Sequence, residues 1–541
     1  MKPSDAPGGP AAWWLRVAIV GGLLGTLALF GTTRLYSGSP VFDLCGDQCK
    51  YLSLADDFPW HRLWGGELFL KHAPWTGWLI GLSRFVIDDW RAGVVSTLAV
   101  AILSWVACGH YLWETGLSWC GIVLGLMYVS VHRWAVVLDS TISRTPLVAL
   151  GTASSLAFLE RAIRIRTGAA YALAAVVLAI TCLLSDQCLL LLPVVVARLI
   201  LEVGRPLAHG ELTRRLLVPL AGITILAWPA VRLYRYATNS LLATGIDGIP
   251  EVVTPIPWSA LFQTDELPQS RPFTIRPLAE WSFPDLFTDM AGLQWGWVVI
   301  APLLVIGGIV DIRLQRRAAA SRLIAVALFY MPAMRFGYEW YSVAMIIPLS
   351  AVIAAGLRPI RRGTAADAAM CAILMAIAGG AAAWWLAHPE ADPAGWRDPR
   401  PGSHFIANRT PITRGAPLAP VLRQIPADVG IMTHICFAPE IRYVSRGPRV
   451  ISLPTRPDLV LPAVEKYNVR LLVLYNAEQT PAGVKLWPMM NANLDSLAVL
   501  QPYLRIVPHW CLTEDLPLSG RSSYLVFKVD RNAMLEDLGR R

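Results

Sequence analysis

Charged residues are scarce in this chain. Asp, Glu, Lys and Arg together make up 16% of its 541 residues, whereas hydrophobic residues make up 55% and the mean hydropathy is +0.47. In an ordinary soluble protein about one residue in four is charged. The shortage of charge therefore excludes an ordinary soluble domain and indicates an α-helical polytopic membrane protein, whose apolar helices face lipid.

Several motifs that identify common enzyme classes are also missing. The polar tail, residues 389–541, contains no GxGxxG motif, no Walker loop and no CxxC pair, so nothing in it indicates nucleotide binding or catalysis. No spacing of His and Cys resembles a zinc site. The chain also lacks an internal repeat, which argues against a secondary transporter built from two related halves.

The basic residues indicate which loops of the membrane protein are cytoplasmic. A net charge of +9 would suit a nucleic-acid-binding protein, but these residues form short clusters between apolar runs, as in the cytoplasmic loops of membrane proteins. No nucleic-acid partner is therefore expected. The clusters that we assign to the cytoplasm are Lys2 and Arg16; Arg161, Arg164 and Arg166; Arg198, Arg205, Arg214 and Arg215; Arg313, Arg316, Arg317 and Arg322; and Arg358, Arg361 and Arg362.

The apolar runs predict about eleven spans, each near the roughly 17–25 residues that a bilayer requires. An odd number places the N-terminus inside and the tail outside. Residues 74–87 are too short to cross and are interpreted as a juxtamembrane or re-entrant helix on the outer side. The first run lacks a small-residue cleavage site and is interpreted as an uncleaved anchor. The predicted spans are approximately residues 12–31, 92–113, 116–136, 143–160, 169–185, 187–203, 216–236, 292–311, 321–337, 341–357 and 365–387.

This pattern predicts two domains. Residues 1–388 form the transmembrane domain, with outer loops at residues 32–73 and 237–291. Residues 389–541 form a small extracytoplasmic α/β domain, because short β-forming runs alternate there with helix-compatible stretches. We expect this domain to recognise substrate or to support the site. The β-forming runs are residues 430–437, 449–453, 470–475, 503–507 and 523–529.

The cysteines separate by location. Five lie in or beside predicted spans, where a cysteine behaves as a small hydrophobic residue. Cys45 and Cys49 share the first outer loop, and Cys436 and Cys511 share the tail. Either pair could oxidise outside the cytoplasm, and the sequence leaves both disulfides open.

The loop after the first span contains the sequence DQCKYLSLA at residues 47–55. It resembles the D-E-x-x-Y-x-x-x-A pattern of the GT-C superfamily, in the branch of protein mannosyltransferases and lipid A aminoarabinose transferases. These polytopic glycosyltransferases take a sugar from a polyprenyl-phosphate carrier. Four later segments resemble further motifs of this branch, in order and on the predicted outer side, so that the resemblance covers about the first 360 residues. They are KHAPW at 71–75, VLDS at 137–140, LSDQ at 184–187 with its following Leu–Pro, and RFGY at 335–338.

The sequence departs from this family at three positions. Gln48 replaces the usual second acid, and Ala73 replaces a proline. Asp186 stands where relatives have a lysine that reaches toward the carrier phosphate. The last change removes a cation, so Lys71, His72, Arg144 or Arg335 would have to supply that charge, or the lipid binds differently.

The resemblance implies an inverting sugar transfer, which needs a carboxylate to accept the proton of the acceptor hydroxyl. We expect Asp47 to be this base, with Asp43 as the runner-up. Asp139 would orient the acceptor or a positive side chain, or it would simply cap the helix that starts near Thr141. Tyr51 fits substrate contact and packing equally well.

The departing phosphate needs compensating positive charge. Arg335, beside Tyr338, is the expected phosphate-binding residue, helped by Lys71 and His72, and Asp186 is included among the substrate-binding residues. No cofactor is expected. A divalent metal is possible but not favoured, because Gln48 leaves Asp47 with fewer hard oxygen ligands.

These features predict a glycosyltransferase of the plasma or inner membrane whose active site is extracytoplasmic. Its partners would be membrane lipids, a polyprenyl-phosphate-linked sugar donor, and an envelope lipid, glycan or protein acceptor. Two other functions stay open. A secondary transporter of an envelope precursor would use Asp139, Asp186 and Arg335 for ions or substrate. A non-catalytic scaffold for envelope assembly would have no need of Asp47.

Overall fold

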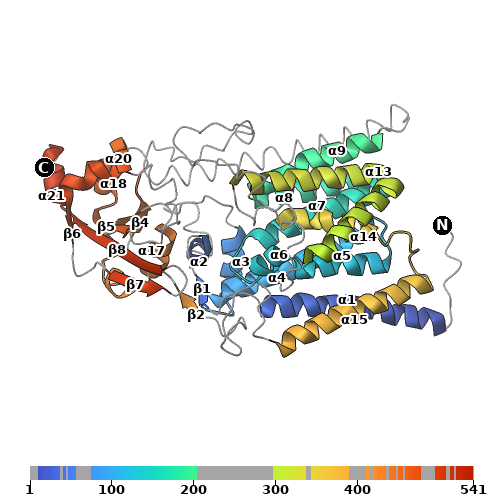
Figure 1. Cartoon of the computed structure of the whole chain (residues 1–541). Helices are drawn as coiled ribbons and strands as arrows, with labels where there is room; N and C mark the ends of the chain where they lie inside the picture. Colours follow the sequence, from blue (N-terminus) through green and yellow to red (C-terminus); the bar gives the residue numbers. More distant parts are fainter. Residues whose placement is uncertain are drawn as a thin grey trace. The chain divides into compact units, whose positions relative to one another are not determined.

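The computed structural model shows two compact units (Figure 1). The first comprises Met1–Pro40, Val94–Tyr234 and Ile275–Thr410, and the second comprises Val41–Gly93, Arg235–Thr274 and Pro411–Arg541. Each unit is described by itself. The residues that the structure describes are 10–36, 41–43, 47–56, 75–203, 296–336, 343–388, 410–412, 418–433, 438–445, 449–454, 457–476, 494–506, 512–516 and 520–539.

The first unit consists of helices, as its apolar composition predicts for a membrane protein. Within the described residues, five helices are long and apolar enough to cross a bilayer, namely α1 (Pro10–Leu35), α4 (Arg91–Glu114), α7 (Thr145–Ile165), α13 (Gly296–Phe336) and α15 (Ala365–Ala387). Shorter apolar helices are α5 (Trp119–Val131), α8 (Gly168–Leu184) and α14 (Ile346–Ala355). The unit also contains α6 (Arg133–Asp139), the 3₁₀ helix η1 (Asp186–Leu190) and α9 (Leu191–Val203). The eleven-span count stays a prediction, and its span at residues 216–236 lies outside the described residues.

Helix α13 joins two of the predicted spans through a bend. Gln315 has non-helical backbone angles, φ −139° and ψ 50°. Asp311 and Arg322 lie on either side of it and form a buried ion pair. In a straight helix these residues would be about 16 Å apart along the axis, more than their side chains span together. The chain must therefore bend sharply at Gln315, and α13 consists of two segments.

Polar side chains tie this bend to two other helices. Gln315 Nε2 and Arg358 Nη1 both donate to the carbonyl oxygen of Thr115, which follows α4, at 3.4 Å and 3.2 Å. Arg358 Nη2 also lies 3.5 Å from Asp311. These arginines belong to the clusters predicted to be cytoplasmic, so this network marks the expected cytoplasmic end of the unit.

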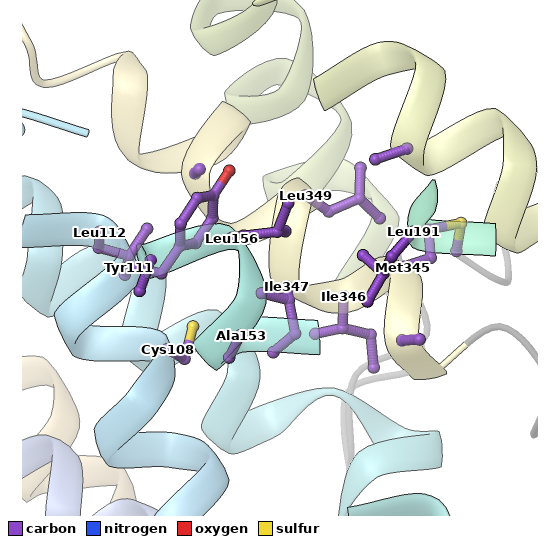
Figure 2. Packing of buried hydrophobic residues seen from close by; sticks show 14 of the residues in the cluster. Cys108, Tyr111, Leu112, Ala153, Leu156, Leu191, Met345, Ile346, Ile347 and Leu349 are labelled. Atoms are coloured by element: carbon purple, nitrogen blue, oxygen red, sulfur yellow. The ribbon is translucent and has the colours of Figure 1, made fainter. Parts of the chain in front are cut away.

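The core of the first unit is packed from helices that are distant in sequence. Figure 2 shows Cys108, Tyr111 and Leu112 of α4 beside side chains of α7 and α14, together with Leu191 of α9. Helices α13 and α14 approach closely at Gly307, where a Cβ atom would overlap the carbonyl oxygen of Val352. A side chain at this position would force the two helices apart, as expected of small residues at membrane helix contacts.

The second unit contains a six-stranded sheet with the order β4-β3-β5-β8-β6, and β7 also pairs with β8. Strand β3 is parallel to β4 and β5, whereas β5, β6 and β7 are antiparallel to β8. The strands are β3 (Gly430–Thr433), β4 (Arg449–Ser452), β5 (Val469–Asn476), β6 (Leu504–Ile506), β7 (Leu512–Leu516) and β8 (Gly520–Val529). Each of the five β-forming runs predicted in the tail overlaps one of these strands.

The alternation of side chains along the strands gives the sheet two apolar faces. Ile431, Leu471 and Val473 pack on one face with α16 (Ala419–Leu422) and α17 (Ala438–Ser445). Met432 and Leu472 pack on the other face with α18 (Val460–Lys466), α20 (Leu494–Leu500) and α21 (Arg531–Asp537). Two short 3₁₀ helices, η7 (Pro457–Leu459) and η9 (Gln501–Tyr503), complete this α/β part.

Residues 41–93 belong to the same unit as the sheet. Strand β1 (Val41–Asp43) pairs with β2 (Thr410–Ile412) in a separate two-stranded sheet. Helix α2 (Asp47–Asp56) packs against α3 (Trp75–Ser83) and against α17 (Figure 1). Helix α3 occupies most of the segment interpreted as a juxtamembrane helix. Helix α2, within the segment predicted to be the first outer loop, is thus packed against the α/β part, although nearly 400 residues separate them in sequence.

Candidate functional site

Helix α2 carries the predicted general base at its first position. The structure describes the backbone of Asp47, which begins α2, and of Asp43, which ends β1. Tyr51, one turn after Asp47, is 2% exposed, and Cys49, Leu52 and Ala55 are also buried. These residues form a face that is packed along the whole helix. The burial of Tyr51 favours packing over direct contact with a substrate, and the catalytic role of Asp47 stays a prediction.

Asp139 forms an ion pair with an arginine that the sequence analysis did not select. Arg34, at the end of α1, donates from Nε and Nη2 to Asp139 Oδ2 at 3.1 Å and 2.9 Å. Arg34 is fully buried and Asp139 is 6% exposed. Both bonds go to Oδ2, so Oδ1 of Asp139 lies outside the pair. The structure thus gives Asp139 the positive side chain that was one of its predicted partners.

The alternative in which Asp139 caps the following helix is wrong. Asp139 is the last residue of α6, whereas α7 begins at Thr145 with Arg144 in the cap position and no side-chain cap bond. Five residues separate the two helix ends, so the side chain of Asp139 is not positioned at the first amides of α7.

The remaining donors of Arg34 close the end of α5. Nη2 donates to the carbonyl oxygen of Val129 at 3.1 Å, and Nη1 donates to the carbonyl oxygen of Ser130 and to Thr33 Oγ1, the latter at 3.0 Å. All five N–H groups of the guanidinium are therefore used. Since none is left for a ligand, Arg34 does not bind a phosphate in this arrangement.

A break in the helix explains why these carbonyl groups need donors. His132 separates α5 from α6 with extended backbone angles, φ −64° and ψ 121°. A helix end leaves its last carbonyls without intrahelical partners, and such groups are costly inside a membrane protein. Thr33 Oγ1 also donates to Ser130 O at 3.0 Å, and Trp105 Nε1 donates to Ser130 Oγ at 3.2 Å. The guanidinium lies 3.9 Å from the ring centre of Phe30, which adds a cation–π contact.

The position of Arg34 in the sequence already indicated a specific local role. It lies at the outer end of the first predicted span, whereas the other basic residues of the membrane domain gather mainly on the cytoplasmic side. A basic residue placed against this rule needs a local reason, and Asp139 together with the open end of α5 supplies it. The partner could not be identified from sequence, because 105 residues separate the two side chains.

The other predicted residues are described less fully. Asp186 is the first residue of η1, after Ser185, whose Oγ accepts a bond from Gln187 N at 3.3 Å. Arg335 is the penultimate residue of α13. For both, the structure describes the backbone alone. Lys71, His72 and Tyr338 lie outside the described residues, as do Cys45, Cys436 and Cys511, whereas Cys49 is buried in α2. The predicted phosphate site therefore stays a prediction.

The part of the chain that the structure describes contains no preformed metal-binding cluster. There, no three His, Cys, Asp or Glu side chains come together closely enough to hold a metal ion. Asp139 has Arg34 as its charged partner instead. The expectation of a metal-independent reaction stays a prediction, because the side chain of Asp47 is not among those described.

Known proteins resemble this chain in structure rather than in sequence. No protein-family model matches the sequence, and no curated protein matches it. An oligosaccharyltransferase from Archaeoglobus fulgidus, tethered with an acceptor peptide containing the NVT sequon, matches with a TM-score of 0.53 and 12% identity, over 94% of this chain and 74% of that chain. ArnT from Cupriavidus metallidurans bound to undecaprenyl phosphate matches with a TM-score of 0.52 and 12% identity, over 96% of this chain and 98% of that chain.

Both similar structures are polytopic GT-C glycosyltransferases. The resemblance predicted from the motifs is confirmed at the level of the fold, over nearly the whole chain. A sequence identity of 12% supports a shared fold and nothing more, so substrates and site residues do not follow from it. The fold and the apolar helices together indicate an integral membrane protein.

Proposed function

We propose that this chain, which has the fold of the polytopic GT-C glycosyltransferases, transfers a sugar from a polyprenyl-phosphate carrier to an envelope lipid, glycan or protein on the extracytoplasmic face. The observation that carries the proposal is the match of 96% of this chain to 98% of ArnT, a structure with undecaprenyl phosphate bound. The DQCKYLSLA motif supports it independently, because its first residue begins α2 just after the first span.

The reaction needs one base and one stabilised leaving group. Asp47 takes the proton of the acceptor hydroxyl as that oxygen forms a bond to the anomeric carbon. The bond from the anomeric carbon to the phosphate oxygen breaks, and its electron pair stays on the phosphate. The products are the glycosylated acceptor and the polyprenyl phosphate, and the proton remains on Asp47 until it is passed to water.

Asp139 would orient the acceptor. Arg34 binds Oδ2 of Asp139 and holds the carboxyl group in place, whereas Oδ1 lies outside this pair. A carboxyl oxygen held in one place can accept a hydrogen bond from a sugar or acceptor hydroxyl. Arg34 is then a positioning residue, since all of its donors are used within the protein.

Cations near the end of α13 would bind the carrier phosphate. Arg335 is the leading candidate because Asp186 stands at the lysine position of the family, with Lys71 and His72 as helpers. A phosphate in a partly desolvated groove requires such compensation. We therefore expect Arg335→Ala to weaken the binding of undecaprenyl phosphate more than Lys71→Ala does, and Asp186→Lys to leave it unchanged or tighter.

Binding of undecaprenyl phosphate to the full chain in nanodiscs, measured by native mass spectrometry, tests this charge assignment. Normal binding by Arg335→Ala together with loss of binding by Asp186→Lys would give Asp186 a positive role of its own and would remove Arg335 from the phosphate site.

The base is tested by Asp47→Asn, which keeps the size of the side chain but removes its basicity. Turnover should fall about 100-fold or more, while undecaprenyl-phosphate binding stays near that of the native chain. The measurement is the release of undecaprenyl phosphate from undecaprenyl-phosphate-linked sugars supplied with an envelope extract as acceptor. Asp43→Asn is the matched control, and it should retain most of the activity.

The outcomes separate the alternatives. Near-normal turnover by Asp47→Asn with loss in Asp43→Asn would move the base to Asp43. Absence of sugar transfer by the native chain, combined with passage of a labelled precursor across vesicles that contain it, would replace the enzyme by a transporter. Absence of both would favour the scaffold.

A further inference from the structure

Helix α2 needs external support to hold its first residue in place. It has ten residues, and isolated helices shorter than about 12–15 residues are marginal in water. Its packed face, Cys49, Tyr51, Leu52 and Ala55, spans most of its length. The position of Asp47 therefore depends on the elements that cover this face.

Two described helices pack against α2, and they differ in how firmly they are anchored. Helix α3 has nine residues and presents Gly77 and Gly81 on its buried side, one turn apart, which permits close approach. Helix α17 is fixed to the six-stranded sheet, because Ala438 and Ile441 belong to the apolar core formed with β3, β4, β5 and β8. Helix α17 therefore connects the six-stranded sheet to α2.

Glu440 lies on the side of α17 that the sheet does not cover. At 100° per residue, it is roughly 130° around the helix from the midpoint of Ala438 and Ile441. It is nevertheless only 1% exposed. Besides β3, β4 and α16, which share the sheet-side core, the described element that packs on α17 is α2. Glu440 is therefore buried on a side of α17 that the sheet does not cover, and α2 is the described helix, apart from α16, that packs on α17.

A buried carboxylate restricts this interface more than an apolar side chain would. Burial without hydrogen bonds or a cation is costly, so Glu440 must keep a defined set of partners. Such bonds have preferred directions, whereas apolar contacts tolerate sliding and rotation. A carboxylate held between α17 and α2 would fix the rotation and the axial position of one helix against the other.

We propose that α17 is the positioning element for α2 and that Glu440 is its positioning residue, so that the six-stranded α/β part holds the catalytic helix in register. This inference rests on the proposed function, because it assigns a purpose to the position of Asp47. It makes the α/β part a component of the active site, where the sequence had left substrate recognition and support equally open.

The test measures the mobility of α2 and the reaction separately. In the full chain in nanodiscs, Glu440→Ala should raise amide hydrogen exchange of residues 48–56 by about tenfold or more, because α2 opens more easily. Turnover should fall about tenfold or more while the KM for the sugar donor changes less than about threefold, since Asp47 is misplaced but the donor site is intact. Glu440→Gln keeps an acceptor oxygen and should recover part of both effects.

Val464→Ala is the matched control. Val464 is fully buried on the opposite face of the same sheet, in α18, so its truncation weakens the sheet without touching α2. It should leave exchange of residues 48–56 within about twofold of the native value. Leu52→Ala gives a second approach from the α2 side. It should raise exchange of residues 48–56 while strands β3 and β5 keep their protection.

Each outcome decides the proposal. If Glu440→Ala and Leu52→Ala raise exchange in α2 no more than Val464→Ala does, α17 does not position α2. If exchange rises but turnover of an active native chain does not change, the position of α2 is irrelevant to catalysis and the inference fails. If the native chain transfers no sugar, the proposed function fails, and the exchange data alone then decide whether α17 holds α2. Should Glu440→Ala not fold, Leu52→Ala and Glu440→Gln carry the same comparison.

Discussion

The two ends of α5 are closed by charged side chains from other helices, in different ways. At the N-terminal end, Asp367 of α15 accepts bonds from the amides of Trp119 and Cys120 at 3.3 Å and 2.8 Å. At the C-terminal end, Arg34 of α1 donates to the carbonyls of Val129 and Ser130. A carboxylate at the first end and a guanidinium at the second both match the helix dipole. Both capping side chains are fully buried.

The difference lies in what neutralises the capping charge. Asp367 also accepts a bond from Gly363 N at 2.9 Å, and among the described residues it forms no ion pair. Arg34 instead pairs with the buried carboxyl group of Asp139. Closing a helix end therefore does not require an ion pair in this protein. The presence of Asp139 at one end alone needs a further reason, and the proposed site on the extracytoplasmic face supplies one.

The largest expected effect comes from breaking the pair at the C-terminal end. Arg34→Met should lower stability by about 3–5 kcal/mol, because Asp139 is left buried without its cation. The carbonyl oxygen of Val129 also loses the donor that Arg34 supplied, whereas that of Ser130 keeps Thr33 Oγ1. The intrinsic fluorescence of the 22 tryptophans reports the thermal unfolding of the protein in detergent. A loss below about 1 kcal/mol would show that water or another cation replaces Arg34.

Removing both charges should cost less than removing one. Arg34→Met combined with Asp139→Leu leaves no unpaired charge, so stability should fall by only about 2 kcal/mol, mostly from the carbonyl of Val129. Sugar transfer should still be lost, because Asp139 is absent. Recovery of stability without recovery of transfer separates the functional role from the structural one. If the double variant were as unstable as Arg34→Met, the cost would come from the carbonyl of Val129 rather than from the pair.

A smaller effect is expected at the N-terminal end. Asp367→Asn keeps an acceptor oxygen for the amides of α5 but loses the charge, so stability should fall by about 1 kcal/mol. Transfer should be unchanged, because this end belongs to the cap and not to the site. A selective loss of turnover in a stable Asp367→Asn protein would contradict the distinction between the two ends.

The last prediction concerns the orientation of α5 in the membrane. Its substitutions should change stability very little. In a Cys-free background, Asp88→Cys should react with a membrane-impermeant thiol reagent from outside the cell, and Ala366→Cys should react only after permeabilisation. Both positions are exposed. Asp88 precedes α4 on the predicted outer side, and Ala366 adjoins Asp367. The reverse labelling pattern would place the Arg34–Asp139 pair in the cytoplasmic half.

Local pattern was enough to predict most helices of the membrane unit. The run at residues 365–387 coincides with α15, and those near 92–113 and 169–185 agree with α4 and α8 within a residue. Run length and hydropathy are properties of consecutive residues, so they can be read directly. An interruption between the runs at 292–311 and 321–337 was also predicted, but the contacts that hold the bend at Gln315 were not, because Asp311, Arg322 and Thr115 meet only in space.

The candidate site was predicted in part. The acidic residues were selected by type and position, and Asp139 proved to be buried against Arg34. Arg34 was missed and the capping role of Asp139 was wrong, since both depend on where α6 ends and on which helix packs beside it. The sequence alone does not show whether the partner of a carboxylate is water, an amide or an arginine.

The sequence by itself determined that this protein lies in a membrane, where its apolar helices run, and which acidic motif follows the first of them, because composition and short-range order suffice for each. The tertiary structure decided that Arg34 and Asp139 share a buried pair and that α2 packs on α17. Both contacts join segments more than 100 residues apart. Their partners are selected by burial, since a charge or a short helix removed from water is stable only against the group that the fold brings to it.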